Sequence, residues 1–420
     1  MDNRDTEILI IGGGVIGVCA AYYLAEAGRQ VTVVEQGEIA AGSSYGNAGL
    51  IVPSHIVPIA APGALSSGLR WMLDPESPFY IKPRLDLDLI GWLWRFAWAC
   101  RPGPLQRAIP VMRDLGRTSL NLYNELAPLV GQESGYKQGG LLMVFKTSRG
   151  MAGGAEEAHL LQKHGYPVEV LDADGLQRIE PSIRPDVAGG LCYRDDGHFS
   201  PAEFVRGLAR VAQQRGACIH THTEVLGFET DKRRITVVKT THGDCRAKQV
   251  VLAAGSWSSK VGQALRLRLP IQAAKGYSVT IRRPSNAPIM PLLLGESRVA
   301  VTPMISPAGP TLRFAGTLEL AGMDFSINQR RVNAMRRAAR DYLADLEETE
   351  TLEIWRGLRP CTPDGLPIIG RTRAFENLIV ASGHAMLGMS LGPVTGKLVE
   401  QLVRGEKPLM DLTPLRVERF

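Results

Sequence analysis

The first 35 residues carry an ordered pattern of apolar runs and glycines. An apolar run rich in β-branched residues covers 7–11, and a glycine cluster at 12–17 follows it directly. Residues 18–27 then carry alanine and leucine at helical spacing, with Gly28 as a stop signal, and a second β-branched run at 30–35 ends in an acid. This order predicts a strand, a helix and a second strand parallel to the first.

Later segments extend this pattern. Short apolar runs at 249–254 and 378–382 end in small residues or glycine, and we expect them to join 7–11 and 30–35 in one sheet. Amphipathic stretches predict two helices on that sheet, at 201–216 and 393–405. Four alternating segments favour a second, mainly antiparallel sheet. These segments are 139–145, 275–282, 299–304 and 311–320.

The pattern therefore predicts an α/β protein with two interleaved domains. A Rossmann-like nucleotide-binding domain would comprise 1–50, 170–270 and 355–410, and an α+β substrate domain with the antiparallel sheet would comprise 51–169 and 271–354. The length of 420 residues, at about 150 per domain, allows two to three domains. The shared sheet reduces the prediction to two.

Composition and charge exclude several classes of protein. Hydrophobic residues make up 45% and charged residues 21%, which is a globular composition and not a disordered one. The formal net charge of +6 suits an anionic ligand or surface without specifying which. The six cysteines have no CxxC spacing and no accompanying histidine cluster, so we predict no metal site and no disulfide framework.

The start of the chain predicts a cytoplasmic location. Asp2, Asp5 and Glu7 precede the first apolar run, whereas a signal peptide would begin with basic residues and a longer apolar stretch. No run reaches the ~18 consecutive apolar residues that a membrane-spanning helix needs. Peripheral contact with the inner face of the cell membrane is the alternative.

The glycine cluster has the spacing of a dinucleotide-binding turn in its proper context. Gly12 allows the tight turn, Gly14 lets the backbone approach a pyrophosphate, and Gly17 lets the helix pack closely on the strand. The helix N-terminus offers free N–H groups and a positive dipole end to the phosphates. Glu35 can accept both ribose hydroxyls and disfavours a 2′-phosphate.

FAD is favoured over NAD by two later strand ends. The segment QVVLAAG is followed by Ser256 and Trp257, and LIVASG is followed by His384 and the glycine-rich GMSLGP. A long, extended dinucleotide needs close backbone approach at several strand ends, and NAD-binding folds usually need it at fewer. An NAD-linked dehydrogenase is the alternative.

Four segments together resemble the D-amino acid oxidase and dehydrogenase superfamily of FAD-dependent flavoproteins. They are ILIIGGGVIGVCAAYYLAEAGRQVTVVEQ, GSSYGNAG, LRPCTPDGLPIIG and SGHAMLGMSLGP. The central stretches IVPIAAPG, WMLDPESP and KQGGLLMVF look most like the bacterial D-amino acid dehydrogenase branch of the small-subunit type. They also resemble relatives that act on hydroxyprolines and other secondary amines. The resemblance covers nearly the whole chain.

The resemblance, together with position at strand ends, implies a set of residues around FAD. They are Gly12, Gly14, Val15, Ile16, Gly17, Glu35, Gln36, Ser43, Ser44, Asn47, Ala48, Gly49, Leu50, Val225, Ala254, Gly255, Trp257, Gly383, His384, Gly388, Met389, Ser390 and Leu391. A helix beginning near Pro393 would direct its N-terminus at the pyrimidine oxygen of the flavin. Some sarcosine-oxidising relatives bind FAD through a cysteine upstream of the TPD segment. The matching position here is Gly357, so the resemblance implies noncovalent FAD.

The resemblance implies oxidative deamination of D-amino acids. A hydride would leave the Cα–H of a neutral amine for flavin N5, the imine would hydrolyse to a 2-oxo acid and ammonia, and electrons would pass to a quinone or another acceptor. Oxidation of hydroxyproline, proline or another secondary amine is the alternative. A flavin-binding module without chemistry of its own is a second alternative, from a different class.

This chemistry requires a fixed substrate carboxylate, ideally held by a bidentate arginine. Arg359, in WRGLRP, is the first candidate, and Arg356 competes with it. Tyr277, in AAKGYSVT, could hydrogen-bond the carboxylate, cover the pocket or simply pack. His384 could be a flavin neighbour or a base, and His55 could face the pocket or be an ordinary loop histidine.

Two further segments raise the question of a binding surface, one for lipid and one for nucleic acid. LIGWLWRFAWAC at 89–100 contains three tryptophans flanked by arginines. It predicts either a buried helix of the substrate domain or an interfacial helix that contacts lipid near a quinone. The arginine-rich amphipathic segment 328–346 predicts a solvated helix face, since no aromatic stacking residues interleave as they would in a nucleic-acid-binding surface. The sequence indicates no oligomeric state.

Overall fold

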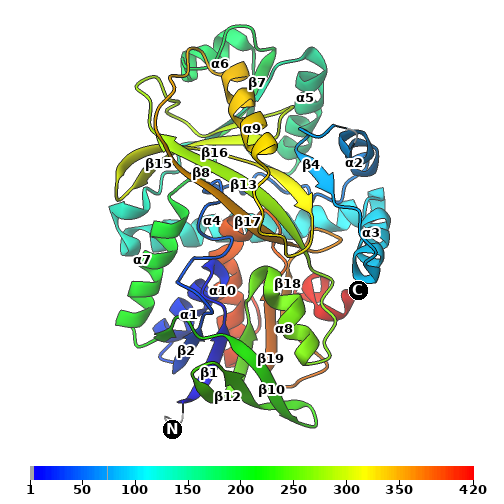
Figure 1. Cartoon of the computed structure of the whole chain (residues 1–420), viewed down its shortest axis with the longest axis vertical. Coiled ribbons are helices and arrows are strands. Elements are labelled where there is room, and N and C mark those ends of the chain that lie inside the picture. The colour runs from blue at the N-terminus through cyan, green and yellow to red at the C-terminus, as the bar shows by residue number, and fades with distance from the viewer. Residues whose placement is uncertain (1–3, 73) are drawn as a thin grey trace.

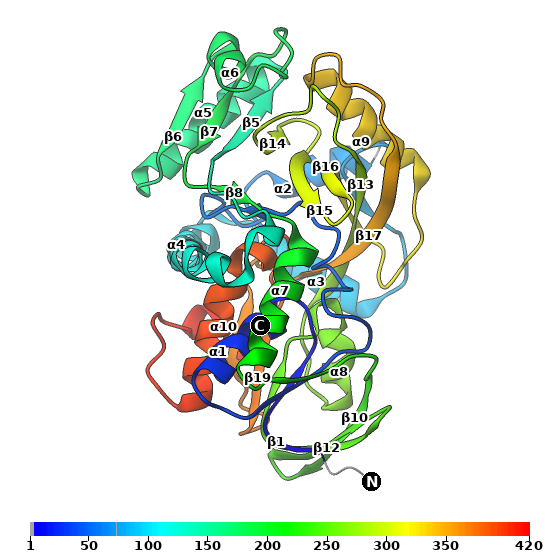
Figure 2. The same cartoon turned by 90° about the vertical axis from the view of Figure 1, so that its left-hand side faces the viewer.

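The computed structural model describes residues 4–72 and 74–420. Asp2 of the acidic start and Leu73 of the WMLDPESP stretch lie outside the described residues. Two large sheets lie toward opposite ends of the molecule (Figures 1 and 2). In Figure 2, β1 and β12 lie at the bottom, β5, β6 and β7 at the top, and α4, α7 and α10 between them.

The first sheet contains the four apolar runs that were predicted to meet. β1 (Arg4–Ile11) pairs in parallel with β2 (Val31–Val34) and with β12 (Gly243–Leu252), which pairs in parallel with β19 (Leu378–Ser382). This arrangement confirms the α/β prediction for this sheet. The remaining strands are β9 (Cys218–His220), β10 (Val225–Asp231), β11 (Arg234–Thr240) and β18 (Ile368–Arg371).

Two helices pack side by side on this sheet with glycines between them. α1 (Val15–Glu26) follows the glycine turn, and α10 (Gly388–Arg404) lies against it (Figure 1). A Cβ on Gly392 would lie 2.6 Å from the Val15 side chain, and one on Gly396 would lie 2.5 Å from the Cys19 backbone. Glycine at these positions therefore permits the close approach.

The second sheet is mainly antiparallel, as predicted. Its central strands are β13 (Gln272–Arg282), β16 (Gly309–Leu320) and β17 (Thr351–Cys361), and β13 pairs antiparallel with both neighbours. The other members are β4 (Phe79–Ile81), β5 (Leu141–Phe145), β6 (Val168–Leu171), β7 (Gly189–Tyr193), β14 (Leu292–Leu294) and β15 (Val299–Ser306). β3 (Leu50–Ile51) and β8 (Gly197–His198) form a separate two-stranded pair.

The strand pairing crosses two of the predicted segment boundaries. The second sheet includes β7, although the nucleotide-binding segment was predicted to begin at 170. The long strand β17 stays paired with β13 beyond residue 355, up to Cys361, which also forms an isolated bridge with His384 just after β19. The strands of the second sheet thus extend across the predicted bounds at 170 and 355, and the division into domains stays a prediction.

The remaining helices cover the sheets and connect them. They are α2 (Ala64–Met72), α3 (Leu87–Ala99), α4 (Pro102–Val130), α5 (Ser148–Lys163), α6 (Ala173–Ile179), α7 (Pro201–Gln214), α8 (Ser258–Ala264) and α9 (Gln329–Tyr342), with short 3₁₀ turns at Gln132–Ser134, Gly255–Trp257, Thr413–Leu415 and Val417–Arg419. None of the helices within 4–72 and 74–420 has the length and apolar character needed to cross a bilayer.

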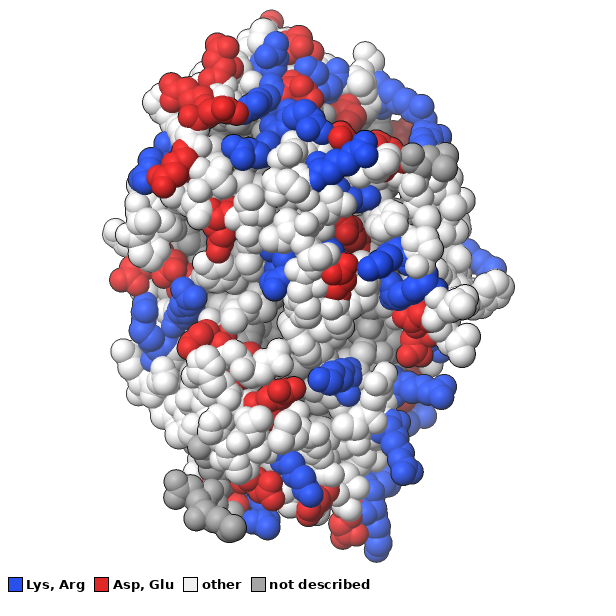
Figure 3. All heavy atoms as spheres, viewed as in Figure 1, with Lys and Arg blue, Asp and Glu red and all other residues white. Residues whose placement is uncertain are grey.

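The arginines of the basic segment 328–346 lie on α9, and several of them have acidic partners within the protein. Arg330 and Arg337 both pair with Glu76, at 3.2 and 2.6 Å, and Arg331 is buried. Figure 3 shows blue and red side chains interspersed over this upper part of the molecule. Arg330, Arg331, Arg337 and Arg340 of α9 therefore serve intramolecular ion pairs.

Candidate functional site

A cavity of about 580 Å³ is lined by residues from both sheets. The first sheet supplies the carboxyl ends of β1, β2 and β12, and the second supplies residues 356–360 of β17. Ligands of doubly wound folds bind at the carboxyl ends of parallel strands. The cavity therefore lies where the sequence pattern placed the dinucleotide.

The glycine turn is shaped by close backbone contacts. Gly12 has φ +114°, and a Cβ there would lie 2.5 Å from the Ala253 carbonyl oxygen. A Cβ on Gly17 would lie 1.9 Å from the Gly12 carbonyl oxygen. Any side chain at either position would displace backbone, so the tight turn and the close packing of α1 both require glycine.

The cavity wall next to this turn presents an anchored carboxylate. Glu35 accepts hydrogen bonds from the Gly13 and Gly37 backbone N–H groups, at 2.6 and 2.9 Å. A carboxylate has about four acceptor positions, so two stay available for ribose hydroxyls. The Ser44 hydroxyl accepts a hydrogen bond from the Val15 N–H at 3.0 Å and so fixes the 42–44 loop at the start of α1.

Two helix N-termini meet this cavity. Gly14 and Val15 line it at the start of α1, and Gly388 and Met389 line it at the start of α10. The helix predicted to begin near Pro393 begins at Gly388 instead. Both N-termini place a positive dipole end at the cavity, which favours anionic groups there.

Most residues predicted to surround the cofactor line this cavity. They are Gly12, Gly14, Val15, Ile16, Glu35, Gln36, Ser43, Ser44, Asn47, Val225, Ala254, Gly255, Trp257, His384, Gly388 and Met389. Seven others are not brought to its surface. They are Gly17, Ala48, Gly49, Leu50, Gly383, Ser390 and Leu391.

Several of these seven support the wall from behind. The Ser390 hydroxyl accepts from the Val52 N–H at 3.0 Å and donates to the Leu50 carbonyl at 3.2 Å, which ties α10 to β3. Gly383 has φ +79°, and a Cβ there would lie 2.6 Å from the Thr362 side chain. These residues shape the cavity by packing.

Arg359 lines the cavity beside β16. Its guanidinium donates to the carbonyl oxygens of Thr317 and Gly316, at an irregular point of β16 where Thr317 has φ +62°. Burial lowers the pKa of Arg359 below its ordinary value. Within the described part of the chain, Arg359 forms no ion pair with a carboxylate. A cavity-lining guanidinium held only by neutral carbonyls is a site for an anionic ligand.

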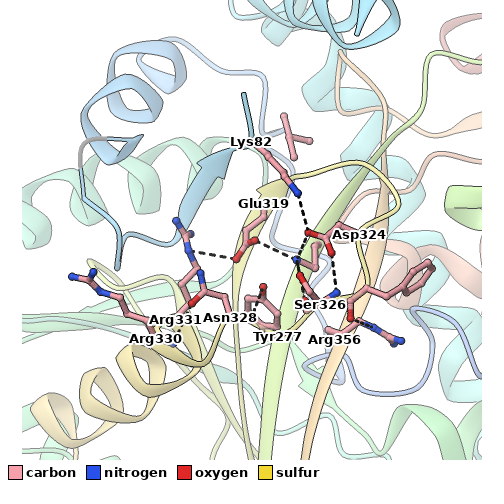
Figure 4. Close-up of polar contacts among 12 residues, drawn as sticks. Lys82, Tyr277, Glu319, Asp324, Ser326, Asn328, Arg330, Arg331 and Arg356 are labelled. Carbon is pink, nitrogen blue, oxygen red and sulfur yellow. Dashed lines mark hydrogen bonds and ion pairs between the residues drawn. The ribbon is translucent and has the colours of Figure 1, made fainter. Parts of the chain in front are cut away.

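Arg356 and Tyr277 have different surroundings. Arg356 also lines the cavity, but its Nε donates to the Phe325 carbonyl oxygen at 3.1 Å. Tyr277 is 1% exposed and does not line the cavity, so of the three roles considered for it, carboxylate binding, pocket cover and packing, its position fits packing. Its hydroxyl accepts from the Asn328 N–H at 3.3 Å (Figure 4).

The sides of β13 explain where Tyr277 lies. Successive side chains of a strand point to opposite faces. A Cβ on Gly276 would lie 2.3 Å from Arg359 Nη1, so position 276 faces Arg359. Tyr277 must then point the other way, toward α9.

The two histidines also differ. His384 lines the cavity and its Nε2 lies 2.9 Å from the Thr395 hydroxyl, which donates its own proton to the Leu391 carbonyl. The His384 Nε2 must therefore carry a proton, and Nδ1 is an acceptor. Burial lowers the pKa of His384 from 6.5 to about 3, so the ring is neutral near neutral pH. His55 does not line the cavity; its ring packs beside Tyr193.

Sequence reasoning missed Arg313 and Phe325. Arg313 donates to the Tyr45 and Asn47 carbonyls, at 3.3 and 3.1 Å, and so holds the loop that lines the cavity. A single arginine in the otherwise apolar alternation of TLRFAG is the signal that could have identified it. Phe325 lines the cavity from the connection between β16 and α9, a stretch that carries no recognisable motif.

These features fit FAD. The glycine cradle has no room for side chains, two helix N-termini suit phosphates and the flavin pyrimidine, and Glu35 suits a ribose. The lining extends from Val225 past both N-termini to His384, so several strand ends meet one elongated ligand.

Comparison with known sequences gives full-length matches. The family model described as FAD dependent oxidoreductase matches residues 7–402. A protein named D-amino acid dehydrogenase from Granulibacter bethesdensis is 32% identical over 420 residues, covering 99% of both chains. One of the same name from Bradyrhizobium diazoefficiens is also 32% identical, with the same coverage.

Solved structures share the fold. Glycine oxidase from Geobacillus kaustophilus superposes with a TM-score of 0.79 at 24% identity, covering 100% of both chains. L-proline dehydrogenase from P. horikoshii has a TM-score of 0.76 at 20% identity, covering 100% of this chain and 98% of that one. L-alpha-glycerophosphate oxidase from Mycoplasma pneumoniae, solved with FAD bound, has a TM-score of 0.71 at 18% identity, covering 96% and 95%. Together with the glycine cradle and the full-length family match, this shared fold means that the chain belongs to the DAO family of FAD dependent oxidoreductases, as the resemblance predicted.

Proposed function

We propose that this protein binds FAD noncovalently and oxidises D-amino acids to 2-oxo acids and ammonia. The observation that carries the proposal is Arg359, whose guanidinium lines the cavity without a carboxylate partner among the described residues. An amino acid substrate supplies the missing carboxylate. The D configuration is supported by the full-length relatives, which are named D-amino acid dehydrogenase.

The residues of the chain bind and orient, while FAD, when bound, accepts the hydride from the substrate. Arg359 fixes the carboxylate, which positions the α-carbon relative to the cavity wall. His384 is neutral, with Nε2–H donated to Thr395, and so adds no charge to the site. The N-terminus of α10 favours negative charge beside Gly388 and so stabilises the reduced cofactor.

Noncovalent attachment is supported by the surroundings of the nearest cysteine. Cys361 is 3% exposed and does not line the cavity. Burial raises the pKa of its thiol to about 12, which disfavours the reactive thiolate. Position 357, where the related covalent enzymes carry cysteine, is a buried glycine.

A substrate screen tests the proposal. Purified protein should contain flavin, and under anaerobic conditions D-amino acids should bleach it while the L-enantiomers do not. The same screen with an artificial electron acceptor should include proline and the hydroxyprolines. Bleaching by these cyclic amines alone would assign the secondary-amine alternative. A flavin that no amine reduces would assign a flavin-binding module.

We also propose that α2 and α3 contact a membrane surface, where a quinone accepts the electrons. α3 buries Leu89 and Trp92, but Trp94 and Trp98 are 75% and 57% exposed. Trp92 donates to the Cys361 carbonyl at 2.9 Å, which links the helix to β17.

Other exposed apolar side chains precede the two tryptophans in the sequence. They are Leu65, Leu69 and Met72 of α2, and Leu85, Leu87 and Ile90 at the start of α3. Arg101 lies over the Trp98 ring at 3.6 Å. Uncharged and basic side chains are interspersed at the right-hand edge of Figure 3, where α2 and α3 lie in Figure 1. Tryptophan with nearby arginine is typical of an interfacial helix.

Co-sedimentation tests this surface. The wild-type protein should pellet with anionic phospholipid vesicles, and a Trp94→Ser, Trp98→Ser variant should stay in the supernatant. Ile289→Ser, which removes a similarly exposed apolar residue (58%) from another part of the surface, is the matched control. If the double variant pellets like the wild type, α3 is not the contact surface.

A further inference from the structure

A cluster of buried charges lies on the face of β13 opposite Arg359. Lys275 is 2% exposed, and its Nζ lies 3.6 Å from Glu319 and 3.2 Å from Asp324. Arg331 of α9, 3% exposed, lies 3.4 Å from the other oxygen of Glu319 (Figure 4). Lys82, which is 56% exposed, also lies 3.7 Å from Asp324, so three cations surround the two carboxylates. Burying such pairs costs desolvation energy, so they are weak evidence for stability alone.

The cluster holds the backbone of segment 321–328, which connects β16 to α9. Lys275 Nζ donates to the Ser326 carbonyl at 2.9 Å, and the Ser326 N–H donates to Asp324 at 2.9 Å. The Asn328 N–H is bound to the Tyr277 hydroxyl. Phe325 lies between the two residues that Lys275 contacts. The buried charges therefore fix the position of Phe325.

Phe325 lines the cavity and contacts Trp257, which also lines it. Its ring stacks on Trp257, with 6.3 Å between ring centroids. Trp257 in turn reaches within 3.7 Å of where a Cβ on Gly42 would be. Two residues later, the Ser44 hydroxyl accepts from the Val15 N–H at the start of α1. A chain of contacts thus connects segment 321–328 to the helix N-terminus that suits a pyrophosphate.

Arg356 completes this part of the wall. Its guanidinium lies 4.8 Å from the Phe325 ring centroid, and its Nε donates to the Phe325 carbonyl oxygen. No acidic side chain in the described part of the chain forms an ion pair with Arg356. The two Nη groups of Arg356 can therefore serve an anion in the cavity that it lines.

We propose that Phe325 and Arg356, held in place by the buried Lys275 cluster, form a retaining wall for the pyrophosphate of FAD. This inference rests on the proposed function, because it requires that the chain binds FAD. In this assignment Arg359 binds the substrate and Arg356 binds the cofactor. Lys275 is a positioning residue that acts through segment 321–328.

The rate of FAD release tests the inference without measuring activity. Flavin-loaded protein is diluted, and free flavin is measured in the filtrate over time. Phe325→Ala and Arg356→Met should each release FAD about tenfold faster than the wild type, since each removes aromatic or charge contacts worth about 1.4 kcal/mol. Met323→Ala and Ile327→Ala are matched controls, because both side chains are about as exposed as Phe325 and neither lines the cavity.

Two further measurements separate the role of Arg356, a charge contact, from that of Lys275, a positioning residue. Salt should accelerate FAD release from the wild type and have less effect on Arg356→Met, because only the wild type has the charge contact. Lys275→Met should accelerate release, whereas Lys82→Met should have little effect, although both lysines lie near Asp324, at 3.2 and 3.7 Å. Lys82 is 56% exposed and screened by solvent.

Failure of the proposed function and failure of the retaining wall give different experimental results. A purified wild-type protein without flavin overturns the proposed function itself. A flavin-containing protein whose Phe325→Ala and Arg356→Met variants release FAD at the wild-type rate overturns only the retaining wall. If Arg356→Met instead raises KM for the amino acid with FAD release unchanged, Arg356 belongs to the substrate site and the assignment is wrong.

Discussion

Two cations on opposite faces of β13, the buried Lys275 and the partly buried Arg359, differ in their partners. Lys275 lies next to two carboxylates, Glu319 and Asp324. Arg359 lines the cavity, and among residues 4–72 and 74–420 its guanidinium donates to main-chain carbonyls and forms no ion pair. A buried charge without a counter-ion is unfavourable. Arg359, which lines the cavity, bears that cost, whereas Lys275, which does not line it, has carboxylate partners. The unbalanced cation therefore indicates the ligand site, and the balanced one indicates architecture.

The largest expected effect comes from removing the unbalanced cation. Arg359→Ala should lower kcat/KM about 10³-fold, or ~4 kcal/mol, because the substrate carboxylate loses its charged partner in a buried site. The flavin content and absorbance spectrum should not change. Arg359→Lys keeps the charge without the bidentate geometry and should recover part of the loss. Wild-type kinetics for Arg359→Ala would remove Arg359 from the substrate site.

Removing the balanced cation should affect stability more than substrate binding. Lys275→Met leaves the buried Glu319 with Arg331 alone and the partly exposed Asp324 with Lys82 alone, and we expect a loss of about 3 kcal/mol in the free energy of unfolding. Lys82→Met should cost less than about 1 kcal/mol, since an exposed ion pair contributes little. Urea unfolding measures both. Equal losses for the two variants would contradict the distinction between the buried and the exposed partner of Asp324.

His384, unlike these two cations, is a buried group that its surroundings keep neutral. Burial lowers its pKa to about 3 in the folded protein from the ordinary value of 6.5, so the unfolded chain binds more protons below pH 6.5. Stability should therefore fall as the pH drops from 6.5 toward 3. Between pH 7 and pH 5 this one group accounts for about 2 kcal/mol.

The His384→Gln variant isolates this contribution. Glutamine keeps a donor for Thr395 and does not titrate, so the variant should lose about 2 kcal/mol less than the wild type between pH 7 and pH 5. Urea unfolding at the two pH values measures the difference. His159→Gln, at an exposed position of α5, is the control. Parallel losses for wild type and His384→Gln would mean that the buried ring is not the source of the pH dependence.

The first sheet could be predicted because its signals are local. Strand, glycine turn, helix and acid follow one another within 4–35, and each limits the next. The start of α10 was harder to predict from the sequence. GMSLGP is rich in glycine, which is unfavourable in isolated helices by about 1 kcal/mol per residue. Packing against α1 overrides that preference, because Gly392 and Gly396 allow the two helices to approach.

The candidate substrate site could be predicted only in part, because strand alternation does not say which face is inward. The sequence places positions 276 and 277 on opposite faces of β13, but the fold decides which one meets the cavity. The sequence left open whether Tyr277 reaches the cavity or packs, and in the structure it is position 276 that faces Arg359. Segment 321–328 had no signal either, since its position depends on partners distant in sequence, Lys275 and Arg356.

The prediction with the smallest expected effect tests whether position 276 of β13 faces Arg359. In Gly276→Ala, the added methyl group would lie 2.3 Å from Arg359 Nη1, so the guanidinium must move away from the Thr317 carbonyl. We expect KM for amino acids to rise about tenfold, about 1.4 kcal/mol, with smaller changes in kcat and in FAD release. Gly153→Ala is the control, since nothing lies within 4 Å of its added methyl. If Gly276→Ala keeps the wild-type KM, the detailed position of Arg359 does not determine carboxylate binding, and the cation needs only to be present in the cavity.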